Sequence, residues 1–429
     1  MTVVADLRIH AAEEPKPRTN GELVLYWMQT TQRVQYNFAL EFAIEQANRL
    51  RLPVLVYHGL RHDYPWASDR IHTFILESVV DLYRDFEARG IQYVFYLERT
   101  GDDAEARRGA GKPSPLVELA RRAALVTTDF FPTFIVPRQI KALRGKVDTP
   151  ILAVDSATVV PMKHFDREHA TAVGFRPRLM AALPEYLRPL KAVKPQVRRR
   201  IEVPFDPINP TPDDIPALVA SCDIDHEVPP ARTLRGGPAA ARRRLDHFIE
   251  RGLPRYEEDR GDPNEDATSM LSPYLHFGNI SPHEVVLQAR EAGPPAQFAK
   301  FQDELLTWRE ISHNFVYYNR RHRTVDSIPG WAREELRKGE ADPPAGALFG
   351  RRDGAGPNRR RALECGPAGL PGGWLDAQLT AHALGQGGAA VDPERSGSVT
   401  SPGAFQQQVF ARRQGSEQLR WNPLDLRQI

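Results

Sequence analysis

Five short apolar runs alternate with segments of helical spacing through the first 160 residues of the chain. These apolar runs cover residues 22–28, 52–59, 91–98, 123–129 and 149–155. Between the first runs, Phe38, Phe42 and Ala43 share one helical face, and a longer segment has room for several helical turns. Strands that alternate with helices over short connections predict a parallel sheet with helices on both faces. We therefore expect a Rossmann-like α/β domain over 21–160, after a polar lead-in without regular structure.

Composition and short motifs narrow the class of protein. A net charge of +2 over 429 residues means that any nucleic-acid surface must be a local patch. Cys222 and Cys365 offer neither a disulfide framework nor a metal-ligand cluster. No GxGxxG follows the first strand, which argues against the usual dinucleotide fingerprint. Neither a signal peptide nor an apolar run of bilayer length is visible, so we expect a cytoplasmic protein without a membrane partner.

A stretch rich in proline and arginine follows the α/β domain. Residues 187–216 hold too many prolines for long regular elements, and we predict an interdomain connector over 161–216. The basic run Arg198–Arg200 is typical of a solvated face, with contact to a phosphate as the alternative.

The sequence over 217–343 predicts an all-helical domain. One of its helices is expected to stop near Gly252. A second helix begins with a capping box, in which Ser281 is the N-cap, Pro282 is at N1 and Glu284 is at N3.

The most informative helix of this domain covers 298–323. Its large apolar residues recur at intervals of three and four, which predicts one buried face: Phe298, Phe301, Leu305, Trp308, Ile311, Phe315 and Tyr318. Glu304 lies between Phe301 and Trp308 on that face. A buried carboxylate needs a partner, so we select Glu304 as a candidate functional residue.

A cluster of hydroxyl-bearing residues precedes another predicted helix. Thr268, Ser269 and Ser272 stand just before or at its start, with Pro273 at N1. Free N–H groups and partial positive charge at a helix start suit a pyrophosphate. Plain capping by serine and threonine is the alternative interpretation.

Tyr256, His276 and His313 are further polar residues whose roles can be considered from the sequence. Tyr256 is able to cover a cofactor ring, although a lone tyrosine is more often part of a core. His276 and His313 have no carboxylates or cysteines at ligand spacing, so we interpret both as structural.

Several stretches, in order along both domains, resemble the class II deoxyribodipyrimidine photolyases. LSPYLHFGNIS (271–281), preceded by YEEDR and followed by DELLTWREISHNFVYYN, is similar to the flavin-binding domain of that family. The segments 23–60 and 126–143 are similar to its N-terminal domain. The resemblance covers about 21–343.

The resemblance implies a carbon–carbon lyase that repairs cyclobutane pyrimidine dimers in UV-damaged DNA with blue or near-UV light. In the family, reduced FAD donates an electron to a dimer flipped out of the duplex, the ring splits, and the electron returns. The N-terminal domain can hold an antenna chromophore, often a deazaflavin. A cytoplasmic enzyme, associated with the nucleoid if the source is bacterial, is expected, with no protein partner implied.

The resemblance also implies roles for individual residues. Glu304 is expected to be the catalytic residue that faces the dimer. The implied cofactor-binding residues are Tyr256, Thr268, Ser269, Met270, Leu271, Ser272, Phe301, Trp308 and Arg309. Relatives usually have Arg-Arg-Glu where this chain has Trp308, Arg309 and Glu310, so one basic residue is lost.

The composition changes abruptly near the end of the resemblance. From Ala347 onward the chain has no Lys, Tyr or Met, and 13 glycines, which a packed helix bundle would not tolerate easily. The family's later flavin-site motifs, which resemble LWNAAQ, MHNYMRMYWGK and LDGRDPNSYAG, are missing. We therefore expect a truncated helical FAD-binding domain and an irregular, disordered tail over 344–429.

A shift of reading frame explains the tail. Codons for LECGPA, read one nucleotide later, can encode WNAAQ, and those for QQQVFARRQGSEQLRW can encode NNKYSLDGRDPNSYAG. Several family motifs emerge in family order with one constant offset. A single insertion or deletion between about Asp342 and Ala347 accounts for this pattern, while a genuine disordered tail is the alternative.

The literal chain is therefore expected to bind FAD weakly or not at all, to be poorly soluble and to repair little. Two other functions remain as alternatives. A cryptochrome-like flavin photoreceptor would share the fold and the cofactor, and a non-functional remnant of a photolyase gene would share only the fold.

Overall fold

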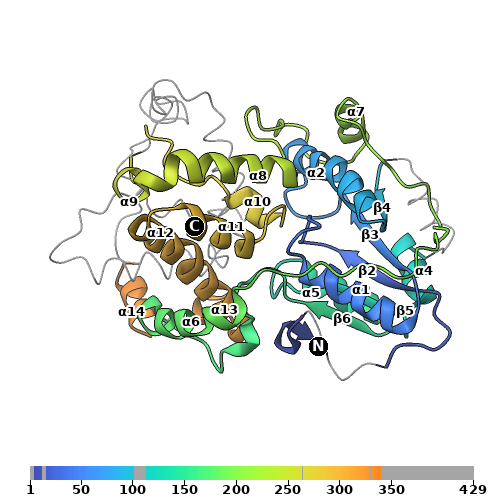
Figure 1. The fold of residues 1–429 in the computed structure, drawn as a ribbon, viewed down its shortest axis with the longest axis horizontal. Coiled ribbons are helices and arrows are strands. Elements are labelled where there is room, and N and C mark those ends of the chain that lie inside the picture. The colour runs from blue at the N-terminus through green and yellow to red at the C-terminus, as the bar shows by residue number, and fades with distance from the viewer. Residues whose placement is uncertain (1–3, 12–15, 101–112, 263, 328–329, 340–429) are drawn as a thin grey trace.

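The computed structural model describes residues 4–11, 16–100, 113–262, 264–327 and 330–339. Figure 1 shows a sheet with its covering helices on one side of the molecule and a group of helices on the other. The predicted order, an α/β part followed by a helical part, is confirmed. The proposed out-of-frame tail lies outside the described residues.

A mostly parallel sheet forms the first part. Its strands are β1 (Ile9–His10), β2 (Leu23–Met28), β3 (Val54–Leu60), β4 (Gln92–Leu97), β5 (Ala123–Asp129) and β6 (Ile151–Val154). They are arranged in the order β1-β6-β5-β2-β3-β4. Strands β2 to β6 pair in parallel, and β1 pairs antiparallel with β6 at one edge. All five strands expected from the apolar runs are present.

Helices cover both faces of this sheet, as the alternating pattern predicted. They are α1 (Phe38–Leu50), α2 (Asp69–Ala88), α4 (Pro115–Arg122) and α5 (Val136–Arg144). Alternate residues of β2 enter different cores: Val24, Tyr26 and Met28 join the cluster that includes α1 and α2, while Leu23 and Leu25 join the cluster that includes α4 and α5. The period of two in a strand explains why every residue of β2 is buried.

The polar lead-in is more ordered than its composition predicted. The 3-10 turn Asp6–Arg8 (η1) and β1 add an edge to the sheet. Arg8 is 2% exposed, and its guanidinium donates to the carbonyls of Asp155 and Thr158 at 3.0 and 2.9 Å. A three-residue turn and a two-residue strand are too short to give a periodic signal, so tertiary contacts rather than local pattern order this segment.

Residues from Leu187 to Asp214 form no helix or strand, in agreement with the prolines of the predicted connector. Figure 1 shows this segment running along the sheet part before it reaches α7 (Ile215–Ala220). The run Arg198–Arg200 is exposed, as expected for a solvated face.

The second part is helical. It contains α6 (Ala172–Tyr186), α8 (Pro238–His247), α9 (Tyr256–Asp259), α10 (Ser272–His276), α11 (Pro282–Ala292), α12 (Pro295–Gln302), α13 (Arg309–Tyr318) and α14 (Gly330–Gly339). Helix α6 lies inside the range assigned to the connector and packs in one cluster with residues of α11 and of the turn before α13.

The capping box of α11 is present only in part. The hydroxyl of Ser281 accepts from the N–H of His283 at 3.2 Å, which confirms the N-cap. The Oε1 atom of Glu284, which the capping box would direct to the N–H of Ser281, accepts from Arg242 Nε at 3.3 Å instead. A buried carboxylate gains more from a charged donor than from a backbone amide.

Two π-helical turns change the helices that the sequence predicted. The first, Phe248–Gly252 (η3), is followed by the 3-10 turn Leu253–Arg255 (η4) and α9, so the chain does not leave the helical path at Gly252. These wider and tighter turns accommodate Gly252 and Pro254, which would weaken a regular α-helix.

The second π-helical turn, Asp303–Trp308 (η5), joins α12 to α13. It shifts the phase of the side chains, so the expected single buried face is not realised. Phe301 and Phe315 are buried, whereas the other apolar residues of the predicted face are half-buried: Phe298, Leu305, Trp308, Ile311 and Tyr318.

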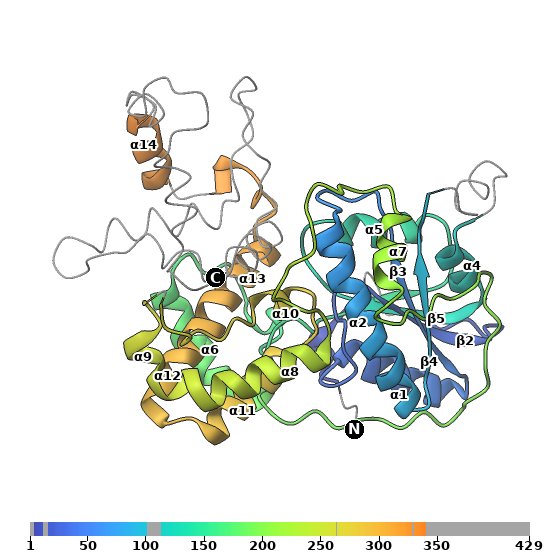
Figure 2. The same cartoon turned by 90° about the horizontal axis from the view of Figure 1, so that it is seen from above.

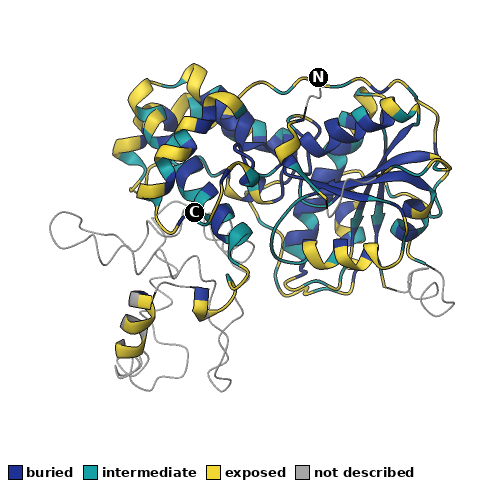
Figure 3. Cartoon of the chain, turned by 90° about the horizontal axis from the view of Figure 1, so that it is seen from below, coloured by how far each residue is buried: buried dark blue, intermediate teal, exposed yellow. Residues whose placement is uncertain are grey.

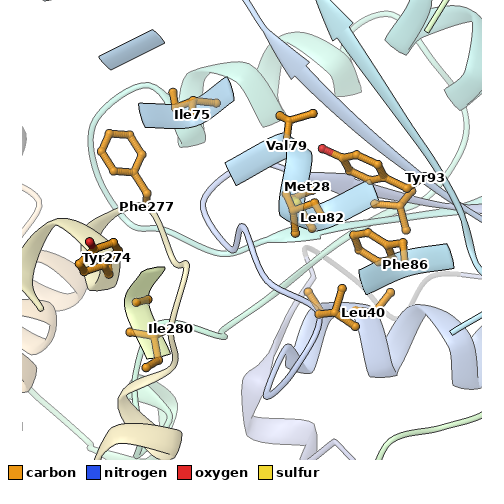
Figure 4. Packing of buried hydrophobic residues seen from close by; sticks show 14 of the residues in the cluster. Met28, Leu40, Ile75, Val79, Leu82, Phe86, Tyr93, Tyr274, Phe277 and Ile280 are labelled. Atoms are coloured by element: carbon orange, nitrogen blue, oxygen red, sulfur yellow. The ribbon is translucent and has the colours of Figure 1, made fainter. Parts of the chain in front are cut away.

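One hydrophobic core continues from the sheet into the helical part. Figure 4 shows Phe277 near Ile75 of α2, with Tyr274 and Ile280 on the same side of the cluster, and Figure 3 shows buried residues extending from the strands into the neighbouring helices. The ring of Phe277 lies 4.9 Å from that of Phe74. The two parts are therefore packed against each other through apolar side chains rather than joined only by the connector.

Candidate functional site

The carboxylate of Glu304 lies at the junction of α12, η5 and the end of α9. Its Oε1 is 2.9 Å from Lys300 Nζ and 3.6 Å from Arg260 Nη1. The side chain is 23% exposed, so it is half-buried rather than enclosed. Lys300 precedes Glu304 by four residues, which places both side chains on the same side of the helix. Lys300 and Arg260 together compensate the negative charge of Glu304, whose partial burial would otherwise cost free energy.

Aromatic rings form the apolar surroundings of this carboxylate. The ring of Tyr256, at the start of α9, lies 5.4 Å from the ring of Phe301 and 5.8 Å from that of Phe248. Tyr256 and Phe301 are both buried. Burial raises the pKa of the Tyr256 phenol, and the negative charge of Glu304 raises it further. Tyr256, Phe301 and Glu304 thus form one cluster.

The hydroxyl-rich segment Thr268–Ser272 covers the end of the loop between α9 and α10 and the first residue of α10. Leu271 is buried, Ser272 is exposed, and the three residues before them are half-buried. Arg244 of α8 donates to the carbonyls of Thr268 and Ser269, at 2.7 and 3.0 Å. The segment is therefore fastened to α8, and its hydroxyl groups, of which only that of Ser272 is on an exposed residue, are of a type that donates hydrogen bonds to phosphate oxygens.

The start of α10 differs slightly from the predicted one. Ser272 is the first helical residue, Leu271 occupies the N-cap position, and no side chain caps the helix. Helix α10 has only five residues, so few peptide dipoles align behind its first turn. The hydroxyl groups, rather than a helix dipole, are the main polar feature of this segment.

Trp308 and Arg309 end η5 and begin α13. Trp308 is half-buried. Arg309 Nη1 donates to the carbonyl of Ala157 at 2.7 Å, which directs this guanidinium toward the loop after β6. The neighbouring Glu310 is fully buried and accepts from the N–H groups of Val159 and Val160. Burial raises the pKa of Glu310 to about 7.

His276 and His313 lie in the range of the Arg309 charge. Surrounding protein lowers the pKa of His276 to about 4, and Arg309 contributes to the lowering. His276 is nevertheless an exposed residue, so protein atoms surround the ring on one side and solvent reaches it on the other. The ring of His313 packs edge-on against Phe131 at 5.7 Å.

The expected site residues thus fall into three groups. The structure joins Tyr256 and Phe301 to Glu304, fastens Thr268–Ser272 to α8, and ties Arg309 to the sheet part. The charged partners in these groups, Lys300, Arg260 and Arg244, were not predicted from the sequence. The spacing of Lys300 and Glu304 carried a signal for one of them, but no local pattern connects Arg244 with a loop more than twenty residues later.

Within the described ranges, no helix is both long enough and apolar enough to cross a bilayer.

Comparison with known proteins connects this architecture with a family. The profile of the DNA photolyase family matches residues 24–196. The deoxyribodipyrimidine photo-lyase of Methanothermobacter thermautotrophicus is 33% identical over 340 residues, which cover 78% of this chain and 71% of the relative. That of Potorous tridactylus is 26% identical over 326 residues, which cover 74% of this chain and 58% of the relative.

A solved structure supports the fold. The Synechocystis sp. PCC6803 cryptochrome superposes with a TM-score of 0.57 at 15% identity, over 94% of this chain and 85% of that protein. The chain spans less than two thirds of the Potorous relative but more than two thirds of the archaeal one. Given the identity and coverage shared with the archaeal protein, the chain belongs to the photolyase/cryptochrome family, as a homologue of the deoxyribodipyrimidine photo-lyases.

Proposed function

We propose that this chain derives from a light-dependent DNA repair lyase that splits cyclobutane pyrimidine dimers. The observation that carries the proposal is the half-buried Glu304 carboxylate, which lies between Lys300 and Arg260 and in the cluster with Tyr256 and Phe301. This arrangement leaves a hydrogen-bonding group accessible in apolar surroundings, which suits a flipped-out base. The partner is UV-damaged DNA.

The residues of the described chain have separate tasks in this proposal. Glu304 accepts a hydrogen bond from the polar edge of the dimer, and Lys300 holds the carboxylate in place. Tyr256 and Phe301 exclude water on one side of the same space. The chemistry that reduced FAD supplies, when bound, is light-driven donation of one electron to the dimer and its recovery.

The donor set of the described residues fits FAD on one side. Thr268, Ser269 and Ser272 would face its phosphates with hydroxyl groups, and the main chain of Met270 and Leu271 would follow them. Trp308, half-buried, offers a ring surface, and Arg309 a positive charge whose Nη1 is already bonded to Ala157. Photolyases and cryptochromes generally bind FAD. An antenna chromophore in the α/β domain remains a further proposal.

The motifs favour class II within the family. We also propose the division into an α/β domain (21–160), a connector (161–216), an incomplete FAD-binding domain (217–343) and an out-of-frame tail (344–429). The replacement of an expected arginine by Trp308 lowers the positive charge near the flavin. A cytoplasmic location is part of the same proposal.

We further propose that one extra base shifted the reading frame between about Asp342 and Ala347. The support is the order and constant offset of the family motifs hidden beneath the tail. Resequencing the gene across the codons for Asp342 to Gly350 tests this directly. A read without the extra base supports an error in the sequence, whereas an unchanged read means a real frameshift and a disabled enzyme.

An illuminated cleavage assay tests the function. The substrate is an oligonucleotide with one cyclobutane thymine dimer, and the proteins are the 429-residue chain and the product of a gene with one base deleted at the shift. We expect light-dependent repair by the second protein and negligible repair by the first. Flavin binding without dimer cleavage by the frame-restored protein would instead favour a cryptochrome-like photoreceptor, and absence of both would favour a gene remnant.

A further inference from the structure

We propose that Arg244 is a positioning residue that pre-forms the segment Thr268–Ser272 for the phosphates of FAD. The inference rests on the proposed function of that segment. Arg244 lies in the last turn of α8, and its side chain is 21% exposed. Helices α8 and α10 lie next to each other in both Figure 1 and Figure 2.

The guanidinium of Arg244 uses all three of its nitrogens on this loop. Nη1 and Nη2 bind the two carboxylate oxygens of Asp266 at 3.0 and 2.6 Å. Nη2 also donates to the carbonyl of Thr268 at 2.7 Å, and Nε donates to that of Ser269 at 3.0 Å. A planar fork with five donors satisfies a carboxylate and two carbonyls together, which a lysine ammonium does not match in geometry.

The loop needs such support because its backbone is unusual. Met270 has a φ of 50°, in the left-handed region that residues with a Cβ adopt at some cost. The next residue, Leu271, is completely buried, so its side chain anchors the chain just after Met270. The hydrogen bonds from Arg244 hold the carbonyls of Thr268 and Ser269, which come just before the left-handed residue Met270. The hydroxyl-bearing residues are therefore fixed from both sides before any ligand arrives, which reduces the ordering cost of binding.

Arg244 also compensates a charge that would oppose phosphate. Asp266 stands two residues before Thr268, and a free carboxylate there would repel a pyrophosphate. His247, one turn after Arg244, places Nε2 3.0 Å from Asp266 Oδ2. The hydrogen bond from Arg244, followed by the smaller influence of His247, lowers the pKa of Asp266. Arg244 thus joins the backbone of the segment to an ionised carboxylate whose charge it compensates.

Titration with two flavins separates a positioning role from a general structural one. FAD carries the pyrophosphate, whereas riboflavin has the same ring system without phosphates. Both are titrated into the 429-residue chain and into the frame-restored protein, as wild type, Arg244→Gln and Arg244→Lys. Arg243→Gln is the matched control, because Arg243 is the exposed neighbour on the same helix.

We expect Arg244→Gln to weaken FAD binding at least about tenfold, the effect of losing a charged hydrogen-bond network, and to leave riboflavin binding unchanged. Arg244→Lys should recover only part of the loss, and Arg243→Gln should match the wild type. Equal loss for both flavins, or no loss for FAD, would overturn the inference. If the wild-type frame-restored protein binds neither flavin, the proposed function itself fails, and the inference fails with it.

Hydrogen exchange gives a second readout that needs no flavin. In the full chain, Arg244→Gln should raise the exchange rates of the amides from Ser269 to Tyr274 by about tenfold or more, with the protection of β2 unchanged. Exchange rates equal to those of the Arg243→Gln control would contradict the positioning role even if the chain retains no FAD.

Discussion

Single carboxylates in this protein differ in the groups that compensate their charge. Glu304 is half-buried and lies between two cations, whereas Glu310, six residues later, is fully buried and bonded to backbone amides. The arrangement at Glu304 leaves a carboxylate that solvent or a ligand can reach, whereas the arrangement at Glu310 fixes α13 to the loop after β6. The same residue type therefore has a proposed role with the substrate at one site and a structural role at the other.

At Glu304, we predict a loss of repair when the charge is removed. In the frame-restored protein, Glu304→Gln should lower the rate of dimer cleavage by about tenfold or more, because a charge-assisted hydrogen bond to the dimer is lost. The assay is light-driven repair of the single-dimer oligonucleotide. Glu291→Gln, at an exposed residue of α11, serves as the control. Equal rates for wild type and Glu304→Gln would show that the carboxylate does not contact the dimer.

At Glu310, we predict a dependence of stability on pH. Burial raises the pKa of Glu310 from 4.5 to about 7, so the folded protein binds a proton more readily than the unfolded chain. The contribution of this residue to the free energy of unfolding should therefore be full below pH 4.5 and should fall as pH rises through 7. Urea unfolding between pH 5 and 8 measures it. Glu310→Gln should remove this part of the slope, and an unchanged difference between the two proteins across that range would contradict the assignment.

Among the elements, the loop Asp155–Val160 after β6 depends most on buried arginines. The carbonyls of Asp155, Thr158 and Val159 accept from Arg8, that of Ser156 from Arg33, and that of Ala157 from Arg309. Three distant parts of the chain therefore meet on one loop. Satisfying these carbonyls compensates the cost of burying a guanidinium.

We predict that Arg8→Met lowers the free energy of unfolding by about 3 kcal/mol, because it leaves buried carbonyls without their charged donor. Arg8→Lys should recover only part of this loss, since one ammonium does not span three carbonyls. Chemical denaturation is the measurement, and Lys16→Met, at an exposed residue of the same lead-in, is the control. A stability change for Arg8→Met no greater than that of the control would refute the role of the arginine.

The regular elements follow from local pattern, but the polar contacts between them do not. The runs that become β2 to β6 and the helices α1 and α2 were predicted because burial on both faces leaves an apolar signature. Strand β1 and the π-helical turn at Glu304 were missed, since both depend on contacts with distant segments. The pairing of Glu304 with Lys300 could be anticipated from the spacing, whereas Arg244 with Asp266 could not.

Across the whole molecule, a close backbone contact joins the sheet part to the helical part. Gly278, with a φ of 69°, lies just after α10, and a Cβ at this position would stand 2.1 Å from the carbonyl oxygen of Thr30. The N–H of Gln32 donates to the carbonyl of Phe277 at 3.2 Å beside it. Glycine is required here both by the backbone conformation and by the approach of the other part.

We predict that Gly278→Ala destabilises the protein by about 2 kcal/mol or more, through strain and displacement of the interface. Gly261→Ala is the matched control, because a Cβ there meets no atom within 4 Å. Thermal unfolding of both variants tests this. Equal stabilities would mean that the interface adjusts without cost.

The flavin content of two purified proteins, measured by absorbance and expressed per chain, tests whether a frameshift has disabled the FAD site. One is the 429-residue chain, and the other is the product of the gene with one base deleted at the proposed shift. We expect near-stoichiometric FAD in the frame-restored protein and little in the present chain, because the family's later flavin-site motifs are missing from the present chain. Near-stoichiometric flavin in the present chain would contradict the frameshift account of a disabled photolyase.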